Sequence, residues 1–289
     1  MISTMSRDTI LVTGSASGVG RSTAALLLAR GFRVIATDVN APALSAAFPA
    51  GTSAATRAIV ADLAAPGDVE DLVSQVKRVL RDEGWVLKGV ALVAGIGWNA
   101  PSLLAEEELV RRTMQVNALA PYALIRGLFD ELEGAPGGGR IVVVSSVAGC
   151  LPQAWCCGYS MSKAAIESMC DCIRFELDAV NSSVSITSLL PALIDTPILD
   201  RNIAGDDAKW ASSAFSPAMK RFTDAIARMR PTSRTLTPEH VATRIADIVT
   251  ANRRGPSREV VARSGALAIR LIAALPDPCR DWFRRKLID

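Results

Sequence analysis

The stretch Thr13-Gly14-Ser15-Ala16-Ser17-Gly18-Val19-Gly20 follows an apolar run over residues 10–13 and precedes a segment with helical spacing. A glycine-rich turn between a strand and a helix is typical of a phosphate-binding loop, because the helix N-terminus offers free N–H groups and a positive dipole end. Gly14 would permit the tight turn, Gly18 the approach of a pyrophosphate, and Gly20 the close packing of helix on strand. No Gly-Lys-Ser or Gly-Lys-Thr follows, which disfavours a nucleotide kinase.

The remaining chain alternates short, β-rich apolar runs with longer helical patterns. The expected strands cover 10–13, 33–37, 58–61, 90–93, 140–145, 184–190 and 259–262, and the expected helices cover 18–30, 69–80 and 103–132. This alternation predicts an α/β fold with a doubly wound parallel sheet of seven strands. Several strands are continuously apolar, as expected when helices cover both faces. No boundary between domains is visible. Residues of about 191–235 break the rhythm and are expected to be a substrate-lid insert.

Composition excludes several classes of protein. Hydrophobic residues make up 49% and charged residues 21% of the 289 positions, which is ordinary for a folded protein. A net charge of +3 is too balanced to predict a nucleic-acid partner. The single histidine, His240, excludes a His-rich metal site, and its helix-start context predicts a surface position. The six cysteines form no CxxC pair, so we expect no metal and reduced thiols.

Two segments bear on location. Residues 1–8 are polar with no apolar run behind them, so no signal peptide is expected. The uncharged run 141–162 contains Ser145, Ser146 and Pro152 and does not indicate a membrane span. We therefore expect a cytoplasmic protein.

Asp38 ends the second expected strand, 18 residues after Gly20. A carboxylate at this spacing accepts hydrogen bonds from the ribose hydroxyls of a dinucleotide. It also repels a 2′-phosphate, which favours NAD over NADP. The alternative is a solvated turn residue without a ligand.

Tyr159 and Lys163 are four residues apart, so on a helix they share a face. A phenol with a pKa of about 10 is a poor base at neutral pH, but a nearby ammonium favours the phenolate. Lowering that pKa by about 2 units needs roughly 3 kcal/mol, which a fixed lysine together with a nicotinium charge in the oxidised complex would supply. Ser146, 13 residues before Tyr159, could hold the oxygen of an alcohol or ketone for proton transfer. The alternative for the Tyr–Lys pair alone is an ordinary amphipathic helix.

Together these motifs resemble the short-chain dehydrogenase/reductase family. The motifs that carry the resemblance are Thr13-Gly14-x-x-x-Gly18-x-Gly20, Asp62, Ala94-Gly95, Asn117, Ser146 and Tyr159-x-x-x-Lys163. They follow the family's order over about the first two thirds of the chain. The resemblance implies a single Rossmann-type domain over residues 1–289, a homodimer or homotetramer, and reversible oxidation of a hydroxyl to a carbonyl.

The resemblance also implies residue roles. Tyr159 would be the general acid/base, Lys163 would lower its pKa and bind the nicotinamide ribose, and Ser146 would orient the substrate. Asn117 would hold a water that links Lys163 to solvent. Asp62 would contact adenine, and Thr196 the nicotinamide carboxamide. The full set expected to bind NAD is Gly14, Ser17, Gly18, Val19, Gly20, Asp38, Asp62, Leu63, Ala94, Gly95, Tyr159, Lys163, Pro191, Ile194 and Thr196.

Two positions depart from the family pattern. Leu92-Val93 stands where the family often has Asn-Asn, which removes a polar anchor. Pro191-Ala192 stands where it tends to have Pro-Gly, and an alanine is harder to place at positive φ. We therefore expect a changed shape of the nicotinamide pocket.

The substrate side is expected to be apolar. Trp98, Leu151, Trp155 and Cys156 should face it, with the insert residues Ile194, Ile198, Leu199, Ile203, Trp210, Phe215, Met219 and Phe222. Such a lining suits a bulky apolar alcohol or ketone such as a steroid, terpenoid or aromatic compound. The alternative is a helix pair that only packs on the sheet. The basic, amphipathic C-terminal arm of about 264–289 is expected to cover the pocket or pack on a partner subunit rather than contact a membrane.

These expectations combine into a hydroxysteroid dehydrogenase-like, NAD-dependent alcohol dehydrogenase or carbonyl reductase that interconverts a secondary alcohol and a ketone. One alternative is a non-catalytic NAD-binding scaffold or sensor, which would be expected to lose the tyrosine, lysine or serine. A second is a nucleotide-sugar epimerase or dehydratase, which would need a larger C-terminal substrate domain.

Overall fold

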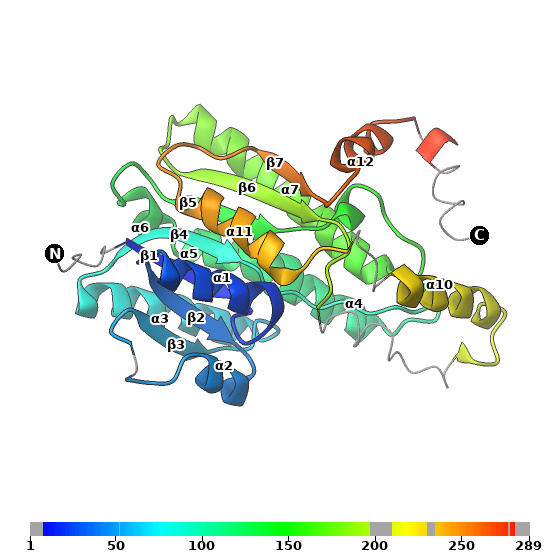
Figure 1. The fold of residues 1–289 in the computed structure, drawn as a ribbon, viewed down its shortest axis with the longest axis horizontal. Coiled ribbons are helices and arrows are strands. Elements are labelled where there is room, and N and C mark those ends of the chain that lie inside the picture. Colours follow the sequence, from blue (N-terminus) through cyan, green and yellow to red (C-terminus); the bar gives the residue numbers. More distant parts are fainter. Residues whose placement is uncertain (1–7, 52, 197–209, 230–234, 277, 281–289) are drawn as a thin grey trace.

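The computed structural model describes residues 8–51, 53–196, 210–229, 235–276 and 278–280 (Figure 1). Seven parallel strands form one sheet in the order β3-β2-β1-β4-β5-β6-β7. Their bounds are β1 Asp8–Thr13, β2 Arg33–Asp38, β3 Thr56–Val60, β4 Val86–Leu92, β5 Arg140–Val144, β6 Ser185–Pro191 and β7 Arg258–Val261. The predicted seven-stranded, doubly wound parallel sheet is confirmed.

Helices cover both faces of this sheet (Figure 1). Their bounds are α1 Gly18–Ala29, α2 Ala41–Ala47, α3 Pro66–Glu83, α4 Glu107–Met114, α5 Ala120–Gly127, α6 Phe129–Glu133, α7 Cys157–Ala179, α10 Ser216–Met229, α11 Pro238–Val249 and α12 Ala266–Ala273. His240 is exposed on α11, as predicted.

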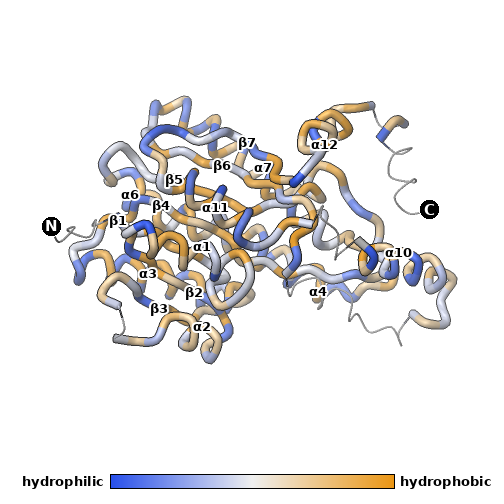
Figure 2. The backbone as a smooth tube through the Cα atoms, viewed as in Figure 1, coloured by the Kyte–Doolittle hydropathy of each residue, from blue (hydrophilic) through white to orange (hydrophobic). Residues whose placement is uncertain are grey.

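Alternating side chains of the strands supply two separate cores. Ile10 and Val12 of β1 pack with α1 and α11 on one face, whereas Leu11 packs with α3, α5 and α7 on the other. Each of these three β1 side chains is fully buried. Figure 2 shows the strands as mainly hydrophobic segments between helices of mixed character. Burial on both faces explains the continuous apolar runs in the sequence.

The register of β1 and β2 brings the glycine-rich turn to Asp38. Thr13 pairs with Thr37, so both strands end at the same edge of the sheet. Ser15 N–H then donates to the carbonyl oxygen of Thr37 at 3.0 Å. In a parallel sheet the carboxyl ends of the strands form the usual binding crevice.

The expected helix over 103–132 is wrong in two respects. It begins only at Glu107, because residues 103–106 form a turn and bend, and a π-helical turn, Gln115–Leu119, interrupts it. Asn117 lies in this π turn, and such turns are frequent at functional sites.

The insert and the C-terminal arm are described in part. Ile198, Leu199 and Ile203 of the insert lie outside the described residues, as do residues 277 and 281–289 of the arm. In the described part, α10 and α12 lie at the end of the molecule toward which the strands point (Figure 1). Within the ranges that the structure describes, no helix is long and apolar enough to cross a membrane.

Arg140 joins several loops at the opposite, amino end of the sheet. It is 3% exposed, at the start of β5. Its guanidinium donates to the backbone carbonyl oxygens of Gly137, Gly138, Gly139, Ser183, Asn252 and Arg253. The buried guanidinium of Arg140 therefore links several loops at the end away from the crevice.

Candidate active site

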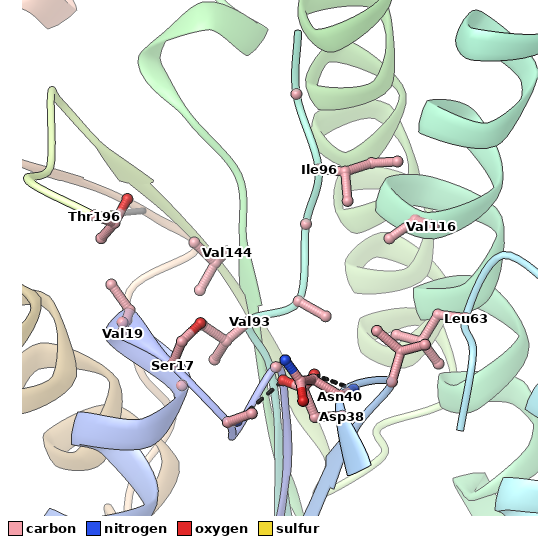
Figure 3. Close-up of a pocket in the computed structure, with 18 of the residues that line it drawn as sticks. Ser17, Val19, Asp38, Asn40, Leu63, Val93, Ile96, Val116, Val144 and Thr196 are labelled. Atoms are coloured by element: carbon pink, nitrogen blue, oxygen red, sulfur yellow. Dashed lines mark hydrogen bonds between the residues drawn. The ribbon is translucent and has the colours of Figure 1, made fainter. Parts of the chain in front are cut away.

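A cavity of about 410 Å³ opens along the carboxyl ends of the strands. It is lined by all fifteen residues that the sequence predicts to bind the cofactor, from the glycine-rich turn through Asp38, Asp62 and Gly95 to Thr196. Figure 3 shows Ser17 and Val19 on one side of this cavity, Asp38 at its base, and Leu63 and Ile96 on the other side. Residues from distant parts of the sequence thus meet in one cavity.

The glycine-rich turn has the geometry of a phosphate cradle. Gly14 and Gly18 adopt φ values of +72° and +50°, a conformation that L side chains rarely adopt. A Cβ on Gly20 would lie 2.1 Å from the carbonyl oxygen of Gly14. The first turn of α1 can therefore pack against the loop only because position 20 has no side chain.

Asp38 is fixed by two backbone N–H groups. Its Oδ2 accepts from Ala16 at 3.0 Å and its Oδ1 from Asn40 at 2.9 Å (Figure 3). The carboxylate therefore faces the cavity in one orientation and connects the glycine-rich turn to the end of β2. Each carboxylate oxygen keeps capacity for a further donor.

Asp62 lies at the same side of the cavity as Arg112. The Asp62 Oδ1 accepts from Ala64 N–H at 2.9 Å, and a guanidinium nitrogen of Arg112 lies 3.9 Å from Oδ2. Arg112 also lines the cavity, which the sequence analysis missed. An exposed arginine on an amphipathic helix gives no sequence signal that separates it from its neighbour Arg111.

The two departures from the family pattern have local explanations. Thr13 Oγ1 accepts from the N–H groups of Val93 (2.9 Å) and Ala94 (3.0 Å), so a hydroxyl of β1 anchors the segment. Ala192 is not among the residues with positive φ, and its N–H donates to Val261 at 2.9 Å. The expected backbone strain at Ala192 is therefore absent.

Tyr159 and Lys163 lie on successive turns of α7 and both line the cavity. The Lys163 Nζ lies 5.5 Å from the centre of the Tyr159 ring and donates to the carbonyl oxygen of Val144 at 2.8 Å. Ser146, two residues after β5, is 8% exposed, and its side chain acts as a hydrogen-bond partner that lowers the pKa of the Tyr159 phenol. The structure thus brings the predicted tyrosine, lysine and serine together.

Burial dominates the acidities of this group. It raises the pKa of the Tyr159 phenol, and the hydrogen bond with Ser146 opposes this rise. Burial also lowers the pKa of Lys163 to about 8, against the attraction of Glu167. In the protein alone the pKa of the phenol is therefore raised, whereas the expected lowering includes the charge of a nicotinium in the oxidised complex. Desolvation is the largest contribution to the pKa of Tyr159, and the side chain that lowers this pKa is Ser146.

Asn117 connects three parts of the site. Its Oδ1 accepts from Ile96 N–H at 2.8 Å, and its Nδ2 donates to Ile96 O (2.8 Å) and Ser162 Oγ (2.9 Å). A Cβ on Gly95 would lie 3.4 Å from Asn117 Oδ1 and 3.6 Å from Lys163 Nζ. Asn117 and Lys163 therefore flank Gly95, although Asn117 and Ser146 do not themselves line the cavity.

An apolar cluster lies beside this group. Trp98, Ala100, Trp210 and Met219 form it, with Trp155 packed against them. The rings of Trp155 and Phe215 meet edge to face, with centres 6.2 Å apart. Several expected substrate-side residues are therefore gathered in one place.

Cys156 does not have the character of a reactive thiol. Its S–H donates to Asn99 Oδ1 at 2.9 Å, and burial raises its pKa to about 12. A thiol that stays protonated is a poor nucleophile. Over the described ranges, no group of three or more His, Cys, Asp or Glu could hold a metal ion.

The comparisons with known proteins agree with this geometry. The sequence pattern of the family described as short chain dehydrogenase matches residues 8–206. The chain belongs to the short chain dehydrogenase family, a class of oxidoreductases with a Rossmann-like fold.

Several curated relatives are similar over part of their length. The "Probable oxidoreductase EphD" of Mycobacterium tuberculosis is 33% identical over 195 residues, which cover 66% of this chain and 32% of that protein. The chain thus matches about a third of the mycobacterial relative. The 1-deoxy-11-beta-hydroxypentalenate dehydrogenase of Streptomyces avermitilis is 29% identical over 77% of this chain and 87% of that protein. The 11-beta-hydroxysteroid dehydrogenase type 2 of Ovis aries is 32% identical over 65% and 43%.

Solved structures show the same fold at low identity. A short chain dehydrogenase/reductase from Burkholderia phymatum, in complex with NAD, has a TM-score of 0.75 and 20% identity, covering 92% of this chain and 93% of that one. An alcohol dehydrogenase from Thermococcus sibiricus, complexed with 5-hydroxy-NADP, has a TM-score of 0.68 and 17% identity over 88% and 96%.

Proposed function

We propose that this chain is an NAD-dependent dehydrogenase or reductase that interconverts a bulky, apolar secondary alcohol and the corresponding ketone. The observation that carries the proposal is the meeting of Tyr159, Lys163 and Ser146 beside a cavity whose other end is the glycine-rich turn. A proton donor and a dinucleotide cradle in one cavity are what alcohol–ketone chemistry requires.

The residues present fit a dinucleotide. The two left-handed glycines and the start of α1 leave backbone N–H groups free for a pyrophosphate. The fixed carboxylate of Asp38 suits the ribose hydroxyls and repels a 2′-phosphate, which favours NAD. When bound, the nicotinamide accepts or donates the hydride. Asp62 and Leu63 would lie near adenine, and Pro191, Ile194 and Thr196 near the nicotinamide.

The protein's own residues handle the proton. The Tyr159 hydroxyl exchanges it with the substrate oxygen, and Ser146 keeps that oxygen within hydrogen-bond distance. Lys163 binds the nicotinamide ribose, and its ammonium, together with a nicotinium charge, favours the phenolate. Asn117, held by Ile96 and Ser162, keeps the Lys163 side of the site in place and holds the water that links it to solvent.

The apolar cluster of Trp98, Trp155, Trp210 and Met219 supports an apolar substrate. The similarity to a hydroxypentalenate and a hydroxysteroid dehydrogenase supports a polycyclic one. A non-catalytic scaffold or sensor is disfavoured, because it would not need to keep the tyrosine, lysine and serine in contact distance.

We also propose that residues 1–289 form one domain that works in the cytoplasm as a homodimer or homotetramer. Exposed apolar side chains on α5 and α7, among them Tyr122, Met161 and Phe175, support an association between copies.

Substitution of the two tyrosines tests the chemistry. The chain has only Tyr159 and Tyr122, and Tyr122 lies exposed on α5. Initial rates would be measured with NAD and a panel of steroid, terpenoid and aryl secondary alcohols. Tyr159→Phe should lose nearly all turnover while its NADH dissociation constant stays within about twofold, and Tyr122→Phe should behave as wild type. Full activity of Tyr159→Phe would disprove the proposed role.

A further inference from the structure

The position of Tyr159 depends on a turn of helix that lacks the usual support. Tyr159 is the third residue of α7, and the N-cap residue Cys156 makes no side-chain capping bond. The first backbone bond of the helix runs from Ser160 N–H to Cys156 O at 2.8 Å. Tyr159 thus lies where backbone N–H groups have no intrahelical partner. Gly158 precedes it, and glycine disfavours a helix by about 1 kcal/mol relative to alanine.

The loop between β4 and α4 contacts this first turn of α7 and stabilises it. Trp98 is 7% exposed, and its indole N–H donates to Thr113 Oγ1 of α4 at 2.8 Å. The Thr113 hydroxyl donates in turn to Leu109 O at 2.7 Å. The Trp98 ring is therefore held in one orientation by α4.

The edge of the same ring that adjoins the indole N–H faces Gly158. A Cβ built on Gly158 would lie 2.6 Å from Cζ2 of Trp98, a distance that real Cβ atoms essentially never show. The space that a side chain would need at position 158 is filled by the indole. Glycine at this position is accordingly explained by the ring and not by helix formation, since its φ is not positive.

Neighbouring residues of the loop strengthen the same connection. Asn99 Oδ1 accepts from the Cys156 thiol at 2.9 Å, and Ala100 N–H donates to Trp155 O at 2.9 Å. On the other side of Tyr159, its carbonyl oxygen accepts from Ser162 Oγ at 2.7 Å. The residues before Tyr159 are thus held by the loop, and the residues after it by the helix.

We propose that Trp98 is a positioning residue for Tyr159: held by its hydrogen bond to Thr113 and packed against Gly158, it sets the place of the phenol relative to Ser146. This inference rests on the proposed function, in which Tyr159 exchanges the proton. Trp98 acts through packing on the first turn of α7 and takes no part in proton transfer itself.

Two single variants and their combination test the contact between the Trp98 ring and Gly158. Gly158→Ala adds a methyl group against the ring and should displace Tyr159, and a displacement of about 1 Å can cost about 100-fold in rate. We expect its kcat to fall by about 10- to 100-fold with the NADH dissociation constant within about twofold. Trp98→Leu should also lower kcat. The double variant should have a higher kcat than Gly158→Ala alone, because the smaller leucine frees the space.

The pH profile separates positioning from loss of stability. The hydrogen bond with Ser146 favours the phenolate, so a displaced phenol should show kcat rising at a higher pH than in wild type. Trp98→Phe keeps a ring but loses the bond to Thr113, and should show a smaller shift in the same direction. Trp85→Phe, a buried tryptophan at the amino end of β4, is the matched control and should leave kcat and the pH profile unchanged.

Tyr159→Phe, measured in parallel, distinguishes the two claims. If Tyr159→Phe keeps its turnover, the proposed function fails. If Tyr159→Phe is inactive, but Gly158→Ala has the kcat and pH profile of wild type, the positioning role of Trp98 fails alone. The positioning role would also be overturned if the loss of kcat in the double variant equalled the product of the losses in Gly158→Ala and Trp98→Leu. If Gly158→Ala does not fold, the test falls to Trp98→Phe. An unshifted pH profile of kcat in Trp98→Phe would then overturn the positioning role of Trp98.

Discussion

Asp38 illustrates how one side chain can serve structure and recognition together. Its carboxylate accepts N–H groups from Ala16 and Asn40, which fixes the glycine-rich turn against the end of β2. The same charge lines the cavity where the adenosine ribose is expected. We therefore propose that Asp38 acts on both the cofactor preference and the geometry of the loop.

Asp38→Asn should shift the preference from NAD toward NADP. Two unit charges about 4 Å apart near a protein surface repel by up to about 4 kcal/mol before salt screening, so removing one of them relieves the 2′-phosphate. We expect the ratio of kcat/KM for NAD to that for NADP to fall at least about 10-fold. Asn keeps one acceptor oxygen, which limits damage to the loop.

Asp71→Asn, on the exposed side of α3, is the control for this change and should leave the ratio unaltered. A wild-type preference for NADP would show that Asp38 does not select the cofactor.

The start of α1 shows how tightly an element can be fitted to its neighbour. Position 20 is in contact with the carbonyl oxygen of Gly14, at a distance that leaves no room for a methyl group. The helix N-terminus is thereby brought to the edge of the cavity. Its dipole and free N–H groups act on a phosphate only from this position.

Gly20→Ala should weaken NAD binding and lower the free energy of unfolding by about 1–3 kcal/mol, because the added methyl group forces the loop or the helix to shift. Isothermal titration with NAD and denaturant unfolding would measure both effects. Gly67→Ala in the first turn of α3 is a matched control, since nothing lies within 4 Å of the added Cβ. It should be neutral or stabilising by up to about 1 kcal/mol. Equal affinities for NAD in the two variants would contradict the packing argument.

The strands could be predicted from sequence because burial on both faces leaves a strong apolar signal. The glycine-rich turn, Asp38 and the Tyr–Lys spacing were visible because each feature is local. The π-helical turn around Asn117 was not, since one added residue in a helix hardly changes the apolar periodicity. The packing of Trp98 on Gly158 could not be predicted, because it joins residues 60 positions apart. The place of Arg112 at the cavity could not be predicted either, because its sequence context is that of any exposed arginine. The raised pKa of Tyr159 depends on burial, which spacing alone does not show.

The two ends of the sheet carry different features. The cavity lies at the carboxyl ends of the strands, whereas Arg140 ties the loops at the amino ends. We therefore expect that a substitution at the amino end can change the stability of the fold without changing the chemistry in the cavity.

Arg140→Met should destabilise the fold by at least about 3 kcal/mol, since several buried carbonyl groups lose their donor. Its NAD affinity and kcat, measured well below the unfolding temperature, should stay within about twofold of wild type. Arg126→Met, on the exposed side of α5, should change the unfolding free energy by less than about 0.5 kcal/mol. A large loss of kcat in folded Arg140→Met would contradict this separation.

The acidity of Tyr159 in the cofactor complex is the most direct test of the account. In Tyr122→Phe, Tyr159 is the only phenol left, so the pH dependence of the phenolate absorbance reports it alone. Without NAD, burial keeps its pKa above the ordinary value of about 10. With saturating NAD, we predict that the phenolate forms at least about one pH unit lower, and that this difference is smaller in Lys163→Met, which keeps only the nicotinium charge. Identical titrations with and without NAD would contradict the claim that Tyr159 is the proton-transferring group.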